Sequence, residues 1–296
     1  MKKKLLSLAL ALVLCMSLTV PAYAAGDFVI EDGVLTSYTG SARSVVIPDG
    51  VTAIGYGAFA VDCENVTEIK IPNTVTSIGR AFSGCENLKR ITIPASVTEI
   101  EEGAFYFAGL TNIEVDPANS YYTSVDGVLF NQDKTLLVQY PMNKAGSSYA
   151  VPAGVTRIGD SAFGVCDNLT RVTIPDGVSS IGASAFDYCR NLTNITIPSS
   201  VTDFGFLAFG ETPWLEQLGE FPIVNHCLLR GPHGKSSVVI PDGVTTICED
   251  AFRFEYDLKH VEIPDSVTKI CDSAFIGCEA LTNLTIPNTV TEIGDE

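Results

Sequence analysis

Three groups of residues in this chain are of types that could carry chemistry. Gly159-Asp160-Ser161-Ala162 has the order of a serine nucleophile block, and a serine hydrolase would also need a histidine base beside the hydroxyl. His226-Cys227 and His233 supply nitrogen and sulfur atoms of the kind that bind zinc. Nine cysteines could pair as disulfides or hold a metal ion.

The sequence around these groups favours a structural role for each of them. The slot of Gly159-Asp160-Ser161 holds Gly182-Ala183-Ser184 and Cys271-Asp272-Ser273 elsewhere, no Gly-x-Ser-x-Gly elbow occurs, and the chain has three histidines in all. No Cys-x-x-Cys pair accompanies the histidines. We therefore predict no catalytic residue, no metal site and no cofactor.

Most of the cysteines occupy one position of a repeat. Five of them stand three residues before a leucine or its substitute: Cys63, Cys85, Cys166, Cys189 and Cys278. Ala108 and Thr212 fill the same slot in other units, so we expect small, buried side chains with free thiols there. One disulfide stays open as an alternative, because Cys248 and Cys271 replace the glycine of Ile-Gly in adjacent units.

The elements that must position these residues repeat along the chain. Ile-Pro or Val-Pro begins at residues 47, 71, 93, 151, 174, 197, 240, 263 and 286. The unit is I-P-x-x-V-T-x-I-G-x-x-A-F-x-x-C-x-x-L-x-x-I-x, clearest in residues 151–173, 174–196 and 263–285. Such a period is typical of stacked repeats, in which neighbouring units bury a continuous core.

Each stretch of the unit has a physical interpretation. Apolar and polar residues alternate up to Ile197, which predicts a short strand that Pro198 ends. Val178 and Ile181 then return to the core, and Ala185-Phe186 follow a helical or 3-10 turn that fills the interior. We predict a right-handed solenoid with one ladder of parallel strands about 4.8 Å apart.

Two insertions interrupt the repeat at residues 116–150 and 220–239. Both resemble residues 27–46, and the stretches 31–35 and 125–129 share an Asp-Gly turn between apolar residues, which is typical of a tight hairpin. We expect a hairpin cap over residues 25–46, a solenoid over 47–296, and internal hairpins that widen or bend the stack. The sequence stops halfway through a unit, so we expect a fragment or a frayed last turn.

The first 24 residues have the pattern of a secretory signal. Three lysines precede an apolar run that ends at Val20, and Ala22-Tyr23-Ala24 predicts cleavage between Ala24 and Ala25. No later run approaches the roughly 18 apolar residues of a membrane span. The net charge of −17 would repel nucleic acid and anionic membranes. We predict an exported protein with no nucleic-acid partner.

The motif C-x-x-L-x-x-I-x-I-P-x-x-V-T-x-I-G-x-x-A-F resembles the BspA-like, treponemal-type leucine-rich repeats of bacterial and some protozoan surface proteins. The resemblance covers about residues 47 to 296 apart from the insertions, and the Asp-Gly-Val-Leu hairpins also look like that family. It implies a leucine-rich repeat solenoid and a role in surface attachment, host-protein binding or polysaccharide contact.

Two surfaces are candidates for a ligand. Outward positions of the predicted strands form a polar row: Arg90, Asn112, Arg171, Asn194, Gln217, His260 and Asn283. The aromatic side chains of the first insertion are the alternative: Tyr121, Tyr122, Phe130 and Tyr140. Arg90 and Arg171 are the best candidates, because arginine often anchors protein interfaces.

We therefore expect a non-enzymatic adhesion or binding scaffold for an extracellular protein or polysaccharide. A carbohydrate-active or hydrolytic protein that uses the insertion loops is one alternative. A structural repeat segment of a larger surface protein is another.

Overall fold

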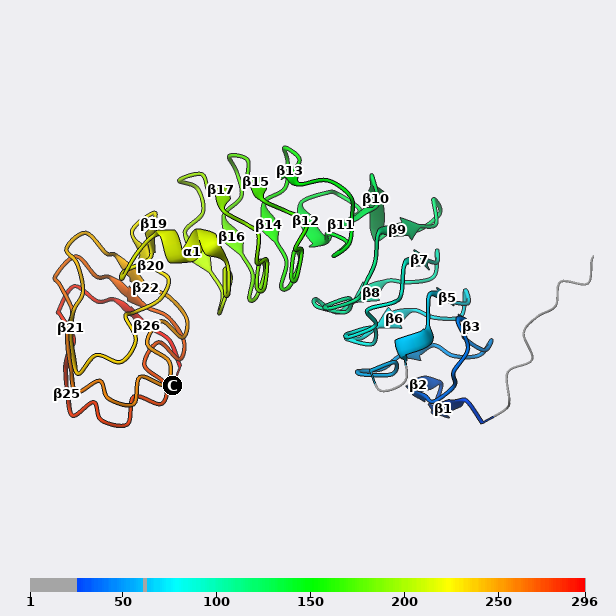
Figure 1. The fold of residues 1–296 in the computed structure, drawn as a ribbon, viewed down its shortest axis with the longest axis horizontal. Helices are drawn as coiled ribbons and strands as arrows, with labels where there is room; N and C mark the ends of the chain where they lie inside the picture. Colours follow the sequence, from blue (N-terminus) through cyan, green and yellow to red (C-terminus); the bar gives the residue numbers. More distant parts are fainter. Residues whose placement is uncertain (1–25, 61–62, 296) are drawn as a thin grey trace, which may run out of the picture.

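The computed structural model describes residues 26–60 and 63–295, and the signal sequence predicted for residues 1–24 lies outside this part. The described chain winds into a solenoid whose turns stack into an arch (Figure 1). Two strands run through most turns, one in a ladder on the inner, concave side of the arch and one in a ladder on its outer, convex side. Each ladder is interrupted twice, so the solenoid consists of three stacks of turns.

The first stack holds the N-terminal turns. Its concave ladder contains β1 (Phe28–Glu31), β2 (Val34–Tyr38), β4 (Ala53–Ile54), β6 (Ser77–Ile78) and β8 (Glu99–Ile100). Its convex ladder contains β3 (Ser44–Val46), β5 (Glu68–Lys70), β7 (Arg90–Ile93) and β9 (Asn112–Val115). A 3-10 helix covers Cys63–Asn65.

The second stack forms the middle of the arch. Its concave ladder contains β10 (Tyr122–Val125), β11 (Val128–Asn131), β12 (Leu136–Gln139), β14 (Arg157–Ile158), β16 (Ser180–Ile181) and β18 (Asp203–Phe204). Its convex ladder contains β13 (Ser148–Ala150), β15 (Arg171–Thr173) and β17 (Asn194–Thr196). Helix α1 (Pro213–Gln217) follows the last of these turns, with the Thr212 hydroxyl accepting the Leu215 N–H as its N-cap.

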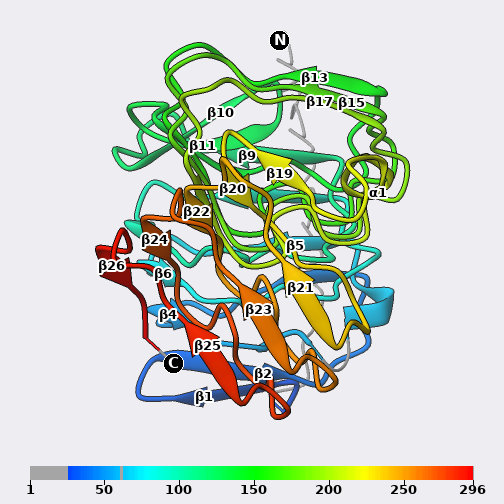
Figure 2. The ribbon, with the colours of Figure 1, turned by 90° about the vertical axis from the view of Figure 1, so that its left-hand side faces the viewer.

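The third stack ends the described chain. Its concave ladder contains β19 (Ile223–Val224), β20 (Cys227–Leu228), β22 (Thr246–Ile247), β24 (Lys269–Ile270) and β26 (Glu292–Ile293). Its convex ladder contains β21 (Ser237–Val239), β23 (His260–Glu262) and β25 (Asn283–Thr285). Figure 2 shows these three convex strands side by side.

The parallel solenoid is confirmed, but the prediction of one strand ladder was incomplete. The Thr-x-Ile stretch of each unit forms a second, two-residue strand, as when Ser77 and Ile78 pair in parallel with Ala53 and Ile54. Threonines strengthen this ladder, because the Thr76 hydroxyl donates to the Thr52 carbonyl at 3.2 Å. So short a strand leaves no alternating pattern in the sequence, and it forms because the neighbouring turn supplies its hydrogen bonds.

A tight antiparallel hairpin begins the concave ladder of each stack. Its two turn residues have positive φ, 51° at Asp126 and 78° at Gly127, as the predicted Asp-Gly turn requires. In the third hairpin Asn225 and His226 take these positions. The stack changes direction at both internal hairpins (Figure 1).

An asparagine docks each internal hairpin onto the stack before it. The Asn119 amide donates to the Pro94 and Val97 carbonyls at 2.8 and 2.9 Å. Asn225 repeats this arrangement with Pro198 and Val201, at 2.8 Å each. Both internal hairpins are therefore anchored to the same two carbonyls of the turn before them, those of the proline and the valine.

The core follows the three stacks. Separate clusters of buried apolar residues are centred on the first, second and third stacks. The phenylalanine of Ala-Phe forms a column of rings, in which Phe163 and Phe186 stack at 4.7 Å and Phe186 and Phe209 at 5.4 Å. The predicted filling of the interior by Ala-Phe is thus confirmed, with turns around it in place of regular helices.

In most turns the residue before Ala-Phe adopts a left-handed backbone. Its φ is 56° at Ser161, 52° at Ser184 and 55° at Asp250, and glycine fills the same position at Gly57 and Gly103. Small polar residues and glycine tolerate this conformation best. The serine of the Gly-Asp-Ser block is therefore a turn residue of the repeat.

Candidate functional site

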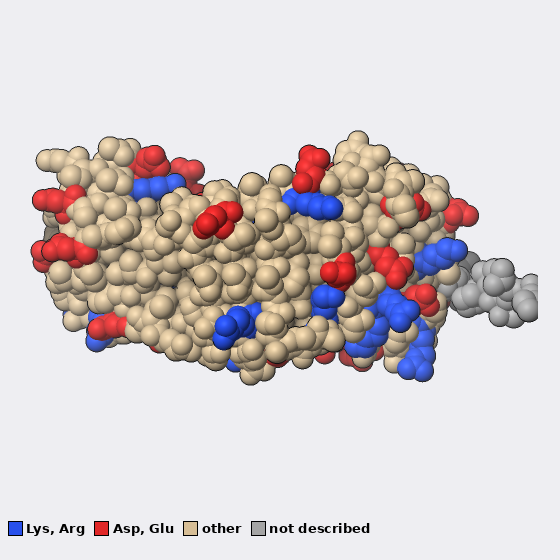
Figure 3. All heavy atoms as spheres, turned by 90° about the horizontal axis from the view of Figure 1, so that it is seen from above, with Lys and Arg blue, Asp and Glu red and all other residues tan. Residues whose placement is uncertain are grey.

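The predicted polar row lies on the convex ladders. Arg90 pairs with Asn112, Arg171 with Asn194 and His260 with Asn283 in parallel register, so these side chains stack in pairs. The row is broken between the pairs by the two junctions. Seen from above the arch, charged side chains gather toward its two ends and the middle of the outer surface is mostly uncharged (Figure 3).

Most members of the row are exposed, and two need comment. Placing Gln217 on a strand was wrong, because it ends helix α1 after the chain leaves the ladder. Asn112 is half-buried under the first insertion, whose Gly127 lies so close that a Cβ there would come within 2.0 Å of the Asn112 Oδ1. Arg90 and Arg171 are exposed, and neither forms an ion pair with any residue that the structure describes.

The aromatic side chains of the first insertion do not form one surface. Phe130 and Tyr140 are buried, which contradicts their proposed role as ligand contacts; Tyr140 stacks on Phe163 at 5.1 Å. The Tyr122 hydroxyl accepts the Ile100 N–H at 2.8 Å and so ties the insertion to the first stack. Tyr121 is exposed and remains available to a partner. Phe130 and Tyr140 are buried because the hairpin and the strand after it cover the end of the second core.

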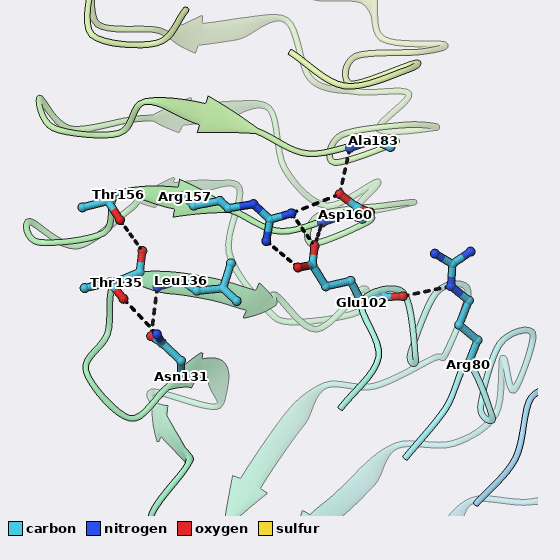
Figure 4. A network of polar contacts seen from close by, with 9 residues as sticks. All are labelled: Arg80, Glu102, Asn131, Thr135, Leu136, Thr156, Arg157, Asp160 and Ala183. Carbon is cyan, nitrogen blue, oxygen red and sulfur yellow. Dashed lines mark hydrogen bonds and ion pairs between the residues drawn. The ribbon is translucent and has the colours of Figure 1, made fainter. Parts of the chain in front are cut away.

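The Gly-Asp-Ser block belongs to a polar network on the concave side of the first junction (Figure 4). The Glu102 carboxylate belongs to the first stack. It accepts hydrogen bonds from both terminal nitrogens of Arg157 and from the backbone N–H of Asp160, two residues of the second stack. The Asp160 carboxylate contacts Arg157 at 3.5 Å and accepts the Ala183 N–H at 3.0 Å. These residues hold two stacks together, and no histidine takes part.

The charges of this network shift the pKa values of its carboxyl groups. Burial would raise the pKa of Glu102, but hydrogen bonds from Arg157 and from the Asp160 N–H outweigh burial and lower it. Burial and the nearby Glu102 carboxylate raise the pKa of Asp160. The network is thus an ion pair with a second carboxylate at its edge.

The thiols form the expected ladder, and all eight described cysteines are free. The thiol of Cys189 donates to the Phe163 carbonyl of the turn before, at 3.0 Å, and Cys278 does the same with Phe252. Burial raises the pKa of Cys166, which keeps this thiol protonated and a poor nucleophile. The recurring cysteine is therefore a small hydrogen-bond donor of the core.

His226 and His233, the two histidines that were candidates for a metal site, contact different partners. A ring nitrogen of His226 contacts the Gly243 carbonyl at 2.9 Å, whereas His233 pairs with Glu255. Within residues 26–60 and 63–295, no three His, Cys, Asp or Glu side chains are grouped as metal ligands would be. The described part of the chain also lacks a helix with the length and apolar character needed to cross a membrane.

One site was not predicted from the sequence: a cavity at the second junction, lined by residues of the second insertion and of the turns on both sides of it. Phe206 from one side and Glu249 and Arg253 from the other meet there. Their positions in the repeat are ordinary, so the sequence carries no local signal for this site. The turn of the stack at the junction brings them together.

The chain matches a known repeat family. The model of the BspA type leucine rich repeat region matches residues 30–143, 142–219 and 233–296. No curated protein matches the chain.

Several solved structures resemble the fold. A leucine rich cell surface protein from Faecalibacterium prausnitzii is 33% identical with a TM-score of 0.56, and the alignment covers 86% of this chain and 59% of that protein. A leucine-rich repeat protein from Eubacterium ventriosum is 26% identical with a TM-score of 0.50, with 89% of each chain covered. The pneumococcal vaccine antigen PcpA shares the fold at 21% identity and a TM-score of 0.57, with 86% of this chain and 63% of PcpA covered.

Proposed function

Because the chain belongs to the BspA-type leucine-rich repeat family, we propose that it is a non-enzymatic scaffold, exported to the cell surface or beyond, that binds an extracellular protein or polysaccharide. The description of the Faecalibacterium protein as a cell surface protein supports this location. The predicted signal sequence supports export.

The exposed polar row on the convex ladders carries the proposal. Its register holds Arg90 and Arg171 at fixed places on a rigid sheet, each beside an asparagine of the next turn. A partner would therefore meet preorganised donors, which lowers the entropic cost of binding. Arginine at such a position donates to carboxylates or to sugar hydroxyl and carboxyl oxygens.

Binding to immobilised extracellular-matrix proteins and mucin tests this role. With the purified chain from residue 25 onward, we expect saturable binding to one of them, and Arg90→Ala with Arg171→Ala should weaken it at least about tenfold. Surface plasmon resonance gives the dissociation constants.

The matched control removes two exposed arginines outside the row, Arg43 and Arg190. Arg43→Ala with Arg190→Ala should leave the affinity unchanged, which separates the row from a loss of overall positive charge. Binding that survives the change at Arg90 and Arg171 but is lost in Tyr121→Ala would place the site on the first insertion instead. Deleting residues 116–150 is unsuitable, because it removes strands of both ladders.

A further inference from the structure

A cavity of about 500 Å³ lies at the junction of the second and third stacks. Its walls come from the last turn of the second stack, including Phe204, Phe206 and Leu207, and from Glu249, Asp250 and Phe254 of the third. The volume falls in the range of small-ligand pockets. Leu207 and Phe254 are 45% and 46% exposed, so the cavity has an apolar rim open to solvent.

The first junction shows why a cavity exists here. In the repeat pattern Phe206 takes the place of Glu102, Glu249 that of Asp160, and Thr246 that of Arg157. At the first junction the arginine side chain fills the space and neutralises the carboxylates. At the second junction Glu249 is the one carboxylate at a corresponding position, Asp250 follows it, and the strand β22 supplies no arginine.

Asp250 is the unusual group of the cavity. Its side chain is 6% exposed, and its Oδ2 atom accepts from Arg253 at 3.3 Å. Its Oδ1 atom is buried and has no hydrogen-bond partner. A buried carboxylate oxygen without a donor is costly, so a donor supplied by a ligand would stabilise it.

The basic residues of the cavity are already paired. Arg253 holds Asp250 Oδ2 and lies over the rings of Phe206 and Phe254, at 4.8 and 4.7 Å. Arg230 pairs with Glu216 at 3.0 Å, and His233 pairs with Glu255. The Glu249 carboxylate accepts a hydrogen bond from the Phe206 backbone N–H at 3.0 Å. It forms no ion pair with a basic side chain of the described residues.

From this surplus of carboxylate oxygen we infer that the cavity binds a basic side chain, arginine or lysine, of a partner polypeptide. The cationic group lies against the Asp250 side chain and faces Glu249, near the place that Arg157 fills at the first junction, and a rotation of the Asp250 carboxyl group lets Oδ1 accept from it. The aliphatic stem of the side chain lies against Phe204 and Phe206. Leu207 and Phe254 at the rim favour a peptide with apolar neighbours over a free amine. The site is separate from the convex row and does not depend on it.

Short peptides test the inference on the whole chain from residue 25. We expect Ac-Leu-Arg-Leu-NH₂ to bind saturably in isothermal titration calorimetry, and Ac-Leu-citrulline-Leu-NH₂, whose urea group is the neutral isostere of guanidinium, to bind at least about tenfold more weakly. Asp250→Asn should lower the affinity for the arginine peptide by a similar factor. Asparagine suits the left-handed backbone at this position, so the variant should fold.

The control is Asp257→Asn, which removes an exposed carboxylate of the same turn and should leave the affinity unchanged. Glu249→Gln is a second variant, expected to weaken binding, for use if thermal unfolding shows that Asp250→Asn is destabilised. The inference is overturned if the neutral peptide binds equally well, or if both cavity variants bind like the parent. Equal binding of agmatine, a guanidinium amine without a peptide, would overturn the assignment to a polypeptide.

Discussion

Glu102 provides the charged contact of the first junction, beside the hydrogen bonds of Asn119 and Tyr122. It joins two stacks through Arg157 and the Asp160 N–H, across one of the two places where the concave backbone ladder is interrupted. A charged acceptor can do this because its oxygens reach across a gap that two-residue strands cannot bridge. The ion pair is partly exposed, so its contribution is about 1 kcal/mol.

Glu102→Gln tests this contribution through its pH dependence. The folded-state pKa of Glu102 is lowered, so its stabilisation is complete above the unfolded-state value of about 4.3 and is lost as pH falls through the lower folded-state pKa. We expect the variant to be less stable at pH 7 and the difference to vanish at low pH. Urea unfolding at a series of pH values measures it. A difference that persists unchanged at the lowest pH would show that the charge is not its source.

At the scale of the element, the unit is held by its column of rings more than by its strands. The strands of the concave ladder from β14 to β18 have two residues each, whereas Phe186 is fully buried between two neighbouring rings. Short strands contribute few hydrogen bonds, and a buried phenylalanine contributes a large apolar area to every turn. The repeat therefore tolerates irregular loops as long as its Ala-Phe positions are filled.

Phe186→Ala should destabilise the protein by about 4 kcal/mol, because it removes a ring and leaves a cavity in the column. Chemical denaturation followed by circular dichroism measures the loss. Tyr56 is 81% exposed, so Tyr56→Ala should change stability by less than about 0.5 kcal/mol. Similar losses in the two variants would contradict the account of the column.

At the scale of the whole molecule, three cores replace the single core of an uninterrupted solenoid. Each hairpin starts a new concave ladder, and besides the asparagine docking only a few side chains of each new stack pack into the core before it, such as Leu129 and Val138 in the first core. In repeat proteins stability spreads mainly between neighbouring turns. The three stacks should therefore lose structure with some independence.

Phe252→Ala tests whether the stacks lose structure independently, because Phe252 is fully buried in the third core. We expect faster amide hydrogen exchange within residues 228–293 and unchanged exchange within residues 35–113. An equal acceleration along the chain would mean that the junctions transmit cooperativity as well as the turns do.

The sequence by itself determined the repeat, its buried positions and its tight hairpins. It did so because the burial of Ile, Val and Phe recurs with each turn, and because an Asp-Gly pair suits a two-residue hairpin turn. It also identified cysteines such as Cys189 as structural, because a cysteine that recurs at one position of the repeat packs in the core of each turn.

The tertiary structure alone decided which side of each turn faces inward and where the stacks meet. The row of Arg90 and Arg171 lies on the convex side because the arch curves toward the two-residue strands, and that curvature comes from packing between turns and from the angle at each hairpin. The burial of Phe130 and Tyr140 and the cavity around Asp250 arise where segments separated by an insertion meet. No local pattern encodes such contacts, because they depend on how whole stacks are placed against each other.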